Sequence, residues 1–89
     1  MQAHVFISGI VQGVGYRYFI KSNAQKLGIT GWVKNTNNGK VEAVFQGEQE
    51  KLQQMIALSH QGPVFSEVND IQLEWEEEKK NSSEFKILK

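Results

Sequence analysis

The sequence predicts an α+β domain in which two helices cover one face of an antiparallel sheet. Three observations support this prediction. Several segments alternate with the two-residue period of strands, two segments repeat apolar residues at helical spacing, and Asn38-Gly39 marks a tight hairpin. A chain of 89 residues with 39% hydrophobic content can build one core between about two layers. We therefore expect a single domain over residues 1–89.

The N-terminal third predicts a strand followed by a helix. Residues 3–11 follow the two-residue period of a strand, with His4, Phe6, Ser8 and Ile10 on one face, and we expect this strand in the middle of the sheet. Residues 17–27 carry apolar side chains at helical spacing, and Gly28 can end this helix in the left-handed conformation. Val5, Ile7 and Val11 share the other face of the strand, and the residues at helical spacing are Phe19, Ile20, Ala24 and Leu27.

A second strand at residues 30–35 and a third at residues 40–46 flank Asn38-Gly39, so these two strands are expected to pair as a hairpin. By the two-residue period, Gly31, Val33 and Asn35 share one face of the second strand and Trp32 lies on the other. In the third strand, Val41, Ala43 and Phe45 are expected to point inward.

The C-terminal half predicts a second helix and two more strands. Glu48 and Glu50 favour the helix N-terminus, and His60 with Gly62-Pro63 ends the helix. Its inner face consists of Leu52, Met55, Ile56 and Ser59.

A strand then runs from residue 68 to residue 75. The acidic run Glu74 to Glu78 is expected to form a solvated hairpin end that leads into a turn at residues 79–83. A short last strand follows at residues 85–88.

The order βαββαβ, with the short C-terminal strand at an edge, is that of the ferredoxin-like split βαβ sandwich. A right-handed crossover makes the first two strands parallel, and the hairpin inserts the third strand between them. The carboxyl ends of the first and second strands then lie at the same edge of the sheet. Asn35 and the turn after the first strand should face each other across one strand, roughly 10 Å apart.

The glycine-spaced turn between the first strand and the first helix is a candidate site. Gly13 and Gly15 let successive backbone N–H groups point inward, and the helix start adds unpaired donors and a positive dipole end. Arg17 in the first helical turn opposes this dipole, which is unfavourable unless an anion lies between them. The turn predicts a phosphate-binding loop, which consists of Gln12, Gly13, Val14, Gly15, Tyr16 and Arg17.

Glycines at such a turn can also make a tight connection that binds nothing, and that alternative stays open. The spacing of Gly9, Gly13 and Gly15 does not match the dinucleotide fingerprint, and the Gly-Lys-Ser/Thr ending of a Walker A loop is absent. If the turn does have a function, it is a simple anion-binding site rather than a nucleotide-binding motif.

Two stretches resemble the signature motifs of the acylphosphatases. The first is Gly-Ile-Val-Gln-Gly-Val-Gly-Tyr-Arg at residues 9–17, and the second begins with Gly-Trp-Val-Lys-Asn-Thr at residue 31 and continues to Gly47. The resemblance implies that Arg17 binds the substrate phosphate with the loop amides, and that Asn35 orients the attacking water. It also implies a small acyl phosphate as substrate, with no metal and no cofactor. Inorganic phosphate or sulfate is expected as a competitive ligand, because its oxygens present the same geometry to the loop donors.

The chemistry of acyl phosphates fits a site with so few groups. The leaving carboxylate has a conjugate acid with a pKa near ~4, so it needs no general acid. Arg17 offers a bidentate cation and Asn35 can hold a water in line. A phosphate ester would call for an acid, a metal or a nucleophile, and the two motifs contain no carboxylate pair, Cys or His.

Composition narrows the expected partners and location. Ten basic residues balance ten acidic ones, so no overall field attracts nucleic acid or an anionic membrane. Cysteine is absent and the first residues lack the features of a signal peptide, so a cytoplasmic protein is expected. Nothing in the sequence demands more than a monomer.

A non-catalytic module of the same fold is the alternative function. It could sense acyl phosphates, mediate interactions, or bind RNA with Trp32 and Phe45 as stacking platforms. His4 is interpreted as an ordinary sheet-face histidine without a partner, and His60 as a charge that complements a helix C-terminus. The acidic run Glu74 to Glu78 is given no role.

Overall fold

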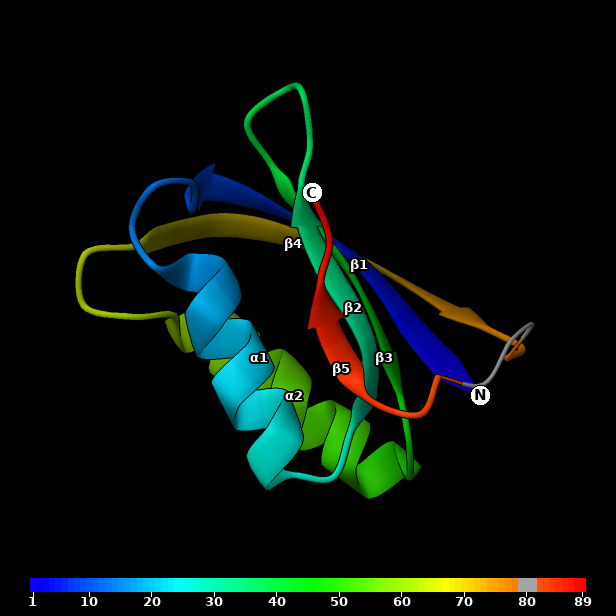
Figure 1. The fold of residues 1–89 in the computed structure, drawn as a ribbon. Coiled ribbons are helices and arrows are strands. Elements are labelled where there is room, and N and C mark those ends of the chain that lie inside the picture. The colour runs from blue at the N-terminus through cyan, green and yellow to red at the C-terminus, as the bar shows by residue number, and fades with distance from the viewer. Residues whose placement is uncertain (79–81) are drawn as a thin grey trace.

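The computed structural model describes residues 1–78 and 82–89. In chain order, the elements are β1 (Gln2–Ile10), α1 (Tyr16–Lys26), β2 (Thr30–Asn35), β3 (Val41–Gln46), α2 (Gln49–Gln61), β4 (Glu67–Glu76) and β5 (Phe85–Ile87). Figure 1 shows that α1 and α2 pack on the same face of the sheet. The predicted α+β architecture is therefore confirmed.

The strand order across the sheet is β4-β1-β3-β2-β5. As predicted, β3 lies between β1 and β2 and is antiparallel to both. The short strand β5 joins the outer edge of β2 in the parallel direction, so the sheet is mixed rather than purely antiparallel.

The expected hairpin between the last two strands is wrong. A right-handed crossover through α2 brings β4 beside β1, which leaves the outer edge of β2 as the free position for β5. The two strands therefore lie at opposite edges of the sheet. Of the turn expected at residues 79–83, residues 79–81 lie outside the described part of the chain.

The core lies between the two helices and one face of the sheet. The residues that the sequence groups on one strand face or at helical spacing and that are buried are Val5, Ile7, Val11, Ile20, Ala24, Val33, Val41, Ala43, Phe45, Leu52, Met55 and Ser59. Phe19, Leu27 and Ile56 are partly buried and pack against this core. Phe85, which was not predicted to be inward, stacks on Phe45 with ring centroids 5.9 Å apart. The three-residue strand β5 therefore contributes to the core as well as to the sheet.

The residue at position 31 must be glycine because β2 and β3 approach closely there. A Cβ atom on Gly31 would lie 1.9 Å from the carbonyl oxygen of Val44. Any side chain would therefore push apart the two strands that carry Asn35 and its neighbours.

Backbone hydrogen bonds close the C-terminal ends of both helices. Beyond α1, the N–H groups of Gly28 and Ile29 donate to the carbonyl oxygens of Gln25 and Ala24, at 3.2 and 2.9 Å. This is a Schellman closure, with Gly28 at a φ of 71° as predicted. The N–H of Gly62 closes α2 by donating to Leu58.

Candidate active site

The turn after β1 adopts the backbone conformation that its glycines predict. Gly13 and Gly15 have φ angles of 75° and 79°, which side chains strongly disfavour. A Cβ atom on either residue would meet nothing within 4 Å, so backbone conformation, not packing, requires glycine here. Space next to the turn is open.

The start of α1 leaves backbone donors available. Gly15 is the N-cap and provides no side-chain cap, and the first helical turn contains no acidic residue. The first amide of this region with an intrahelical bond is that of Phe19, which donates to the carbonyl of Gly15 at 3.0 Å. The preceding N–H groups at the positive end of the helix dipole can therefore donate to an anion.

A hollow of about 290 Å³ lies at this turn. Its lining residues are Val11, Gly13, Gly15, Tyr16, Arg17, Tyr18 and Ile87. Arg17 forms no ion pair with any carboxylate in the described part of the chain. The structure thus brings the predicted cation and the predicted glycines to one cavity.

Tyr16 anchors the turn to the second helix. Its hydroxyl donates a hydrogen bond to the backbone carbonyl of Ser59 at 2.6 Å, and its ring is buried. Burial raises the pKa of the Tyr16 phenol, and the hydrogen bond to Ser59 opposes this shift only in part. Tyr16 therefore stays a neutral donor that fixes the first residue of α1. Its neighbour in the loop, Val14, packs against the core.

Gln12 joins the turn to the β2–β3 hairpin. Its Nε2 donates to the carbonyl oxygens of Thr36 and Lys40, at 2.9 and 2.8 Å. The hairpin is itself closed by the N–H of Thr36, which donates to Lys40 at 2.9 Å. The side chain of Gln12 is thus occupied by the hairpin, and only its backbone N–H remains for the loop.

Asn35 is the last residue of β2, immediately before the carbonyl of Thr36 that Gln12 holds. Asn35 pairs with Val41 of β3, and Val41 pairs with Ile7 of β1, so two interstrand spacings separate Asn35 from β1. Its Oδ1 is buried and has no hydrogen-bond partner among the described residues. Asn35 does not line the hollow around Arg17. It lies at the same end of the sheet and carries an unsatisfied acceptor.

His4 lies on the face of the sheet that the helices do not cover, and the expectation that it has no partner is wrong. Its Nε2 lies 2.7 Å from Glu42 Oε2 and its Nδ1 lies 3.1 Å from Glu76 Oε2. Burial alone would lower the pKa of His4, but hydrogen bonds and charges from these carboxylates raise it above its ordinary 6.5. Local sequence could not reveal this pairing, because it depends on the register of β3 and β4 beside β1.

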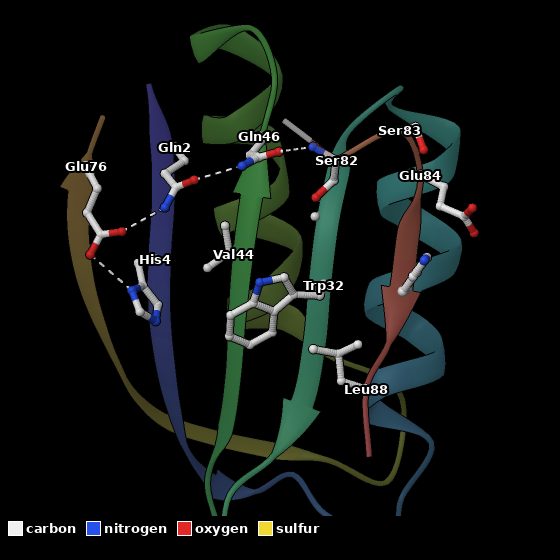
Figure 2. Close-up of a pocket in the computed structure, with 12 residues that line it drawn as sticks. Gln2, His4, Trp32, Val44, Gln46, Glu76, Ser82, Ser83, Glu84 and Leu88 are labelled. Atoms are coloured by element: carbon white, nitrogen blue, oxygen red, sulfur yellow. Dashed lines mark hydrogen bonds and ion pairs between the residues drawn. The ribbon is translucent and has the colours of Figure 1, made fainter. Parts of the chain in front are cut away.

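A row of hydrogen bonds between three side chains and one backbone N–H crosses the same open face (Figure 2). The N–H of Ser82 donates to Gln46 at 3.0 Å, Gln46 donates to Gln2 at 2.9 Å, and Gln2 donates to Glu76 at 2.8 Å. The row and Trp32 border a hollow of about 560 Å³. Glu76, given no role from sequence, therefore supports a polar layer that links β4, β1 and β3.

Comparison with known proteins identifies the family. A family model described as Acylphosphatase matches residues 3–87. The chain belongs to the acylphosphatase family. The acylphosphatase of Nostoc sp. is 47% identical over 77 residues, which cover 86% of this chain and 76% of that protein. The acylphosphatase of Roseiflexus sp. is 40% identical over 87 residues, which cover 98% and 94%. The crystal structure of Bacillus subtilis acylphosphatase superposes with a TM-score of 0.96, at 35% identity, over 99% and 98% of the two chains.

These matches support acylphosphatase activity, which is a hydrolase activity. Membership of the family implies a small acyl phosphate as substrate. The alternative of a non-catalytic sensing or RNA-binding module is not favoured by these matches. Neither helix in the described part of this acylphosphatase is long and apolar enough to cross a membrane.

Proposed function

We propose that this acylphosphatase hydrolyses the carboxyl–phosphate bond through Arg17, the loop amides and a water held by Asn35. Arg17 and the backbone N–H groups of residues 12–17 bind the phosphoryl oxygens. The water oxygen attacks phosphorus, the bond from phosphorus to the acyl oxygen breaks, and its electron pair leaves with the carboxylate. The proton lost by the water passes to the phosphate product or to solvent.

The observation that carries this proposal is the buried Oδ1 of Asn35, which has no partner among the described residues. Buried polar atoms are nearly always satisfied, so this acceptor calls for a donor. A water that donates one O–H to Oδ1 is held in place and keeps a lone pair for attack on phosphorus. The two hydrogen bonds of Gln12 support this role, because they hold the hairpin that follows Asn35 against the phosphate loop.

The charges around Arg17 favour a bound phosphoryl group. The guanidinium can donate two parallel hydrogen bonds, and the helix start adds amide donors of the same sign. Donors fixed before the reaction stabilise the charge that spreads over the phosphoryl oxygens in the transition state. Because a carboxylate is a good leaving group, the mechanism needs no acid, and the hydroxyl of Tyr16 can remain committed to Ser59. No metal takes part in this proposal.

Inorganic phosphate and sulfate are proposed to bind the same turn as competitive ligands, since their oxygens present the same geometry to the same donors. One chain supplies both Arg17 and Asn35, which supports action as a monomer. The balance of ten basic and ten acidic residues supports a protein that binds no nucleic acid. A cytoplasmic location remains a prediction from the sequence.

The test is phosphate release from acetyl phosphate and benzoyl phosphate in the presence of EDTA. We expect turnover by the wild type, competitive inhibition by inorganic phosphate, and much slower hydrolysis of phenyl phosphate, whose leaving group is poorer. Arg17→Gln should lose substrate affinity and turnover together, because Arg17 contacts the phosphoryl group before and during the reaction. No turnover by the wild type, or unchanged kinetics in Arg17→Gln, would contradict the proposal.

A further inference from the structure

The hollow around Arg17 has a polar side and an apolar side. The backbone of Gly13 and Gly15 and the guanidinium of Arg17 form the polar side, in a volume of about 290 Å³. A water molecule occupies roughly 30 Å³ in the liquid. If each of the phosphorus and oxygen atoms of a phosphate group takes about this volume, the group fills about half of the hollow. The apolar side consists of Val11, Tyr16, Tyr18 and Ile87. The proposed phosphate site therefore leaves room beside an apolar wall.

Tyr18 is the exposed part of this wall. It follows Arg17 in the first turn of α1, and 72% of its surface is exposed. Within residues 1–78 and 82–89, its ring contacts no other ring and its hydroxyl has no hydrogen-bond partner. Ile87, in contrast, packs against the core from β5, so it forms a fixed part of the wall. The Tyr18 ring is free to cover a group bound in the hollow.

We infer that Tyr18 and Ile87 contact the acyl group of the substrate, so that the site favours acyl phosphates with an apolar, and above all an aromatic, acyl group. The inference rests on the proposed function, which places the phosphoryl group on Arg17. One oxygen atom separates phosphorus from the acyl carbon, so the acyl group must lie close to the phosphoryl group. Arg17 is the one charged side chain among the described residues that line the hollow. A charged acyl group would find no second partner there.

Contact with the acyl group should affect binding more than the reaction step. The hydrocarbon part of the acyl group does not change while the phosphorus–oxygen bond breaks. Its contacts with the protein are therefore equal in the ground state and the transition state. Such uniform contacts lower KM and leave kcat nearly the same. An aromatic pair changes binding by about two- to tenfold.

The experiment compares kcat and KM on benzoyl phosphate and acetyl phosphate for the wild type and three variants. In Tyr18→Ala, we expect the ratio of kcat/KM for benzoyl phosphate to that for acetyl phosphate to fall by about two- to tenfold, through KM for benzoyl phosphate. Tyr18→Phe keeps the ring and should keep the ratio. Phe65→Ala is the matched control, because Phe65 is an aromatic residue that is 82% exposed and lies outside the hollow.

The outcomes separate this inference from the proposed function. A Tyr18→Ala enzyme with the wild-type ratio would overturn the inference while both substrates are still hydrolysed. A wild type that hydrolyses neither substrate would overturn the proposed function itself. A fall in the ratio that Phe65→Ala reproduces would also overturn the inference, because the effect would then not be specific to the hollow. Because Tyr18 is exposed, the thermal midpoint of its variants should match that of the wild type.

Discussion

At the scale of single residues, Arg17 occupies an unfavourable place for a cation in a helix. A charge of the wrong sign in the first turn costs about 0.3–1 kcal/mol, and α1 has no acidic residue there to offset it. A phosphoryl group between Arg17 and the helix start reverses this effect, because both donors then face an anion. The same placement that weakens the free helix therefore strengthens the complex.

Kinetics can distinguish the proposed role of Asn35, which acts in the reaction step, from that of Arg17, which also acts in phosphate binding. Loss of one oriented group in such a site typically costs on the order of 10²- to 10³-fold in rate. Asn35→Ala should therefore lower kcat by about that factor and leave the inhibition constant of inorganic phosphate nearly unchanged. Steady-state kinetics with phosphate as inhibitor measure both quantities. Near wild-type kcat with weakened phosphate inhibition would make Asn35 a phosphate ligand instead of a water ligand.

The residues that could be placed from sequence are those whose position follows from a local period. Arg17 follows from the helix phase, and Asn35 from the alternation along its strand. The sequence places Tyr16 in the loop for its backbone, but it does not indicate the buried hydroxyl contact with Ser59, because that contact joins segments 43 positions apart. Burial of the amides of Gln2 and Gln46 also does not follow from the sequence, because a glutamine in an alternating strand ordinarily faces water.

At the scale of elements, the site depends on how the β1–α1 turn is held against the β2–β3 hairpin. Gln12 makes that connection with two hydrogen bonds from a single nitrogen. A displacement of 1 Å between catalytic groups can cost about 10²-fold in rate. We therefore propose that Gln12 positions Asn35 relative to Arg17.

Gln12→Leu should lower kcat by roughly 10- to 100-fold. It should also lower the free energy of unfolding by about 1–3 kcal/mol, since two carbonyl groups lose a donor. Kinetics at a temperature where the variant is fully folded, together with urea unfolding, measure the two effects separately. Gln54→Leu, on the exposed face of α2, is the control. A variant that loses stability but keeps kcat when folded would reduce Gln12 to a structural residue.

Sequence patterns predicted which elements form and the placement of β3 between β1 and β2, but they did not predict the partner of β5. The hairpin of β2 and β3 follows from Asn38-Gly39, which acts locally. The partner of β5 follows from the edge that the rest of the sheet leaves open, and three residues carry too little pattern to indicate it. For the same reason, the sequence did not indicate the aromatic contact between Phe85 and Phe45.

At the scale of the whole molecule, the sheet has an apolar face under the helices and a polar layer on the other face. His4 joins three strands in that layer, because Glu42 belongs to β3 and Glu76 to β4. Two further charges lie close by: Glu74 pairs in register with His4, and the Nζ of Lys34 lies 3.9 Å from Glu42. Carboxylates surround His4, which favours its charged form in the folded state.

The stability of the protein should therefore fall as pH rises above neutrality. The pKa of His4 is raised on folding, so its contribution is complete below the unfolded value of about 6.5 and is lost as pH rises through the folded value. Between pH 6 and pH 9, the wild type should lose more unfolding free energy than His4→Gln. Urea unfolding at several pH values measures this difference. Carboxylates ordinarily titrate near ~4, below this range, so equal slopes would contradict a charged His4.

The position of β1 between β3 and β4 has a consequence for synthesis of the chain. Gln2 and the residue it bonds in β4, Glu76, are 74 positions apart. At about 5–20 residues per second, a ribosome adds Glu76 roughly 4–15 s after Gln2. During that interval, one edge of an apolar, alternating strand has no partner within the nascent chain, and unpaired edges of this kind recruit other strands. Aggregation should therefore threaten the incomplete chain far more than the finished protein, in which both edges of β1 are paired.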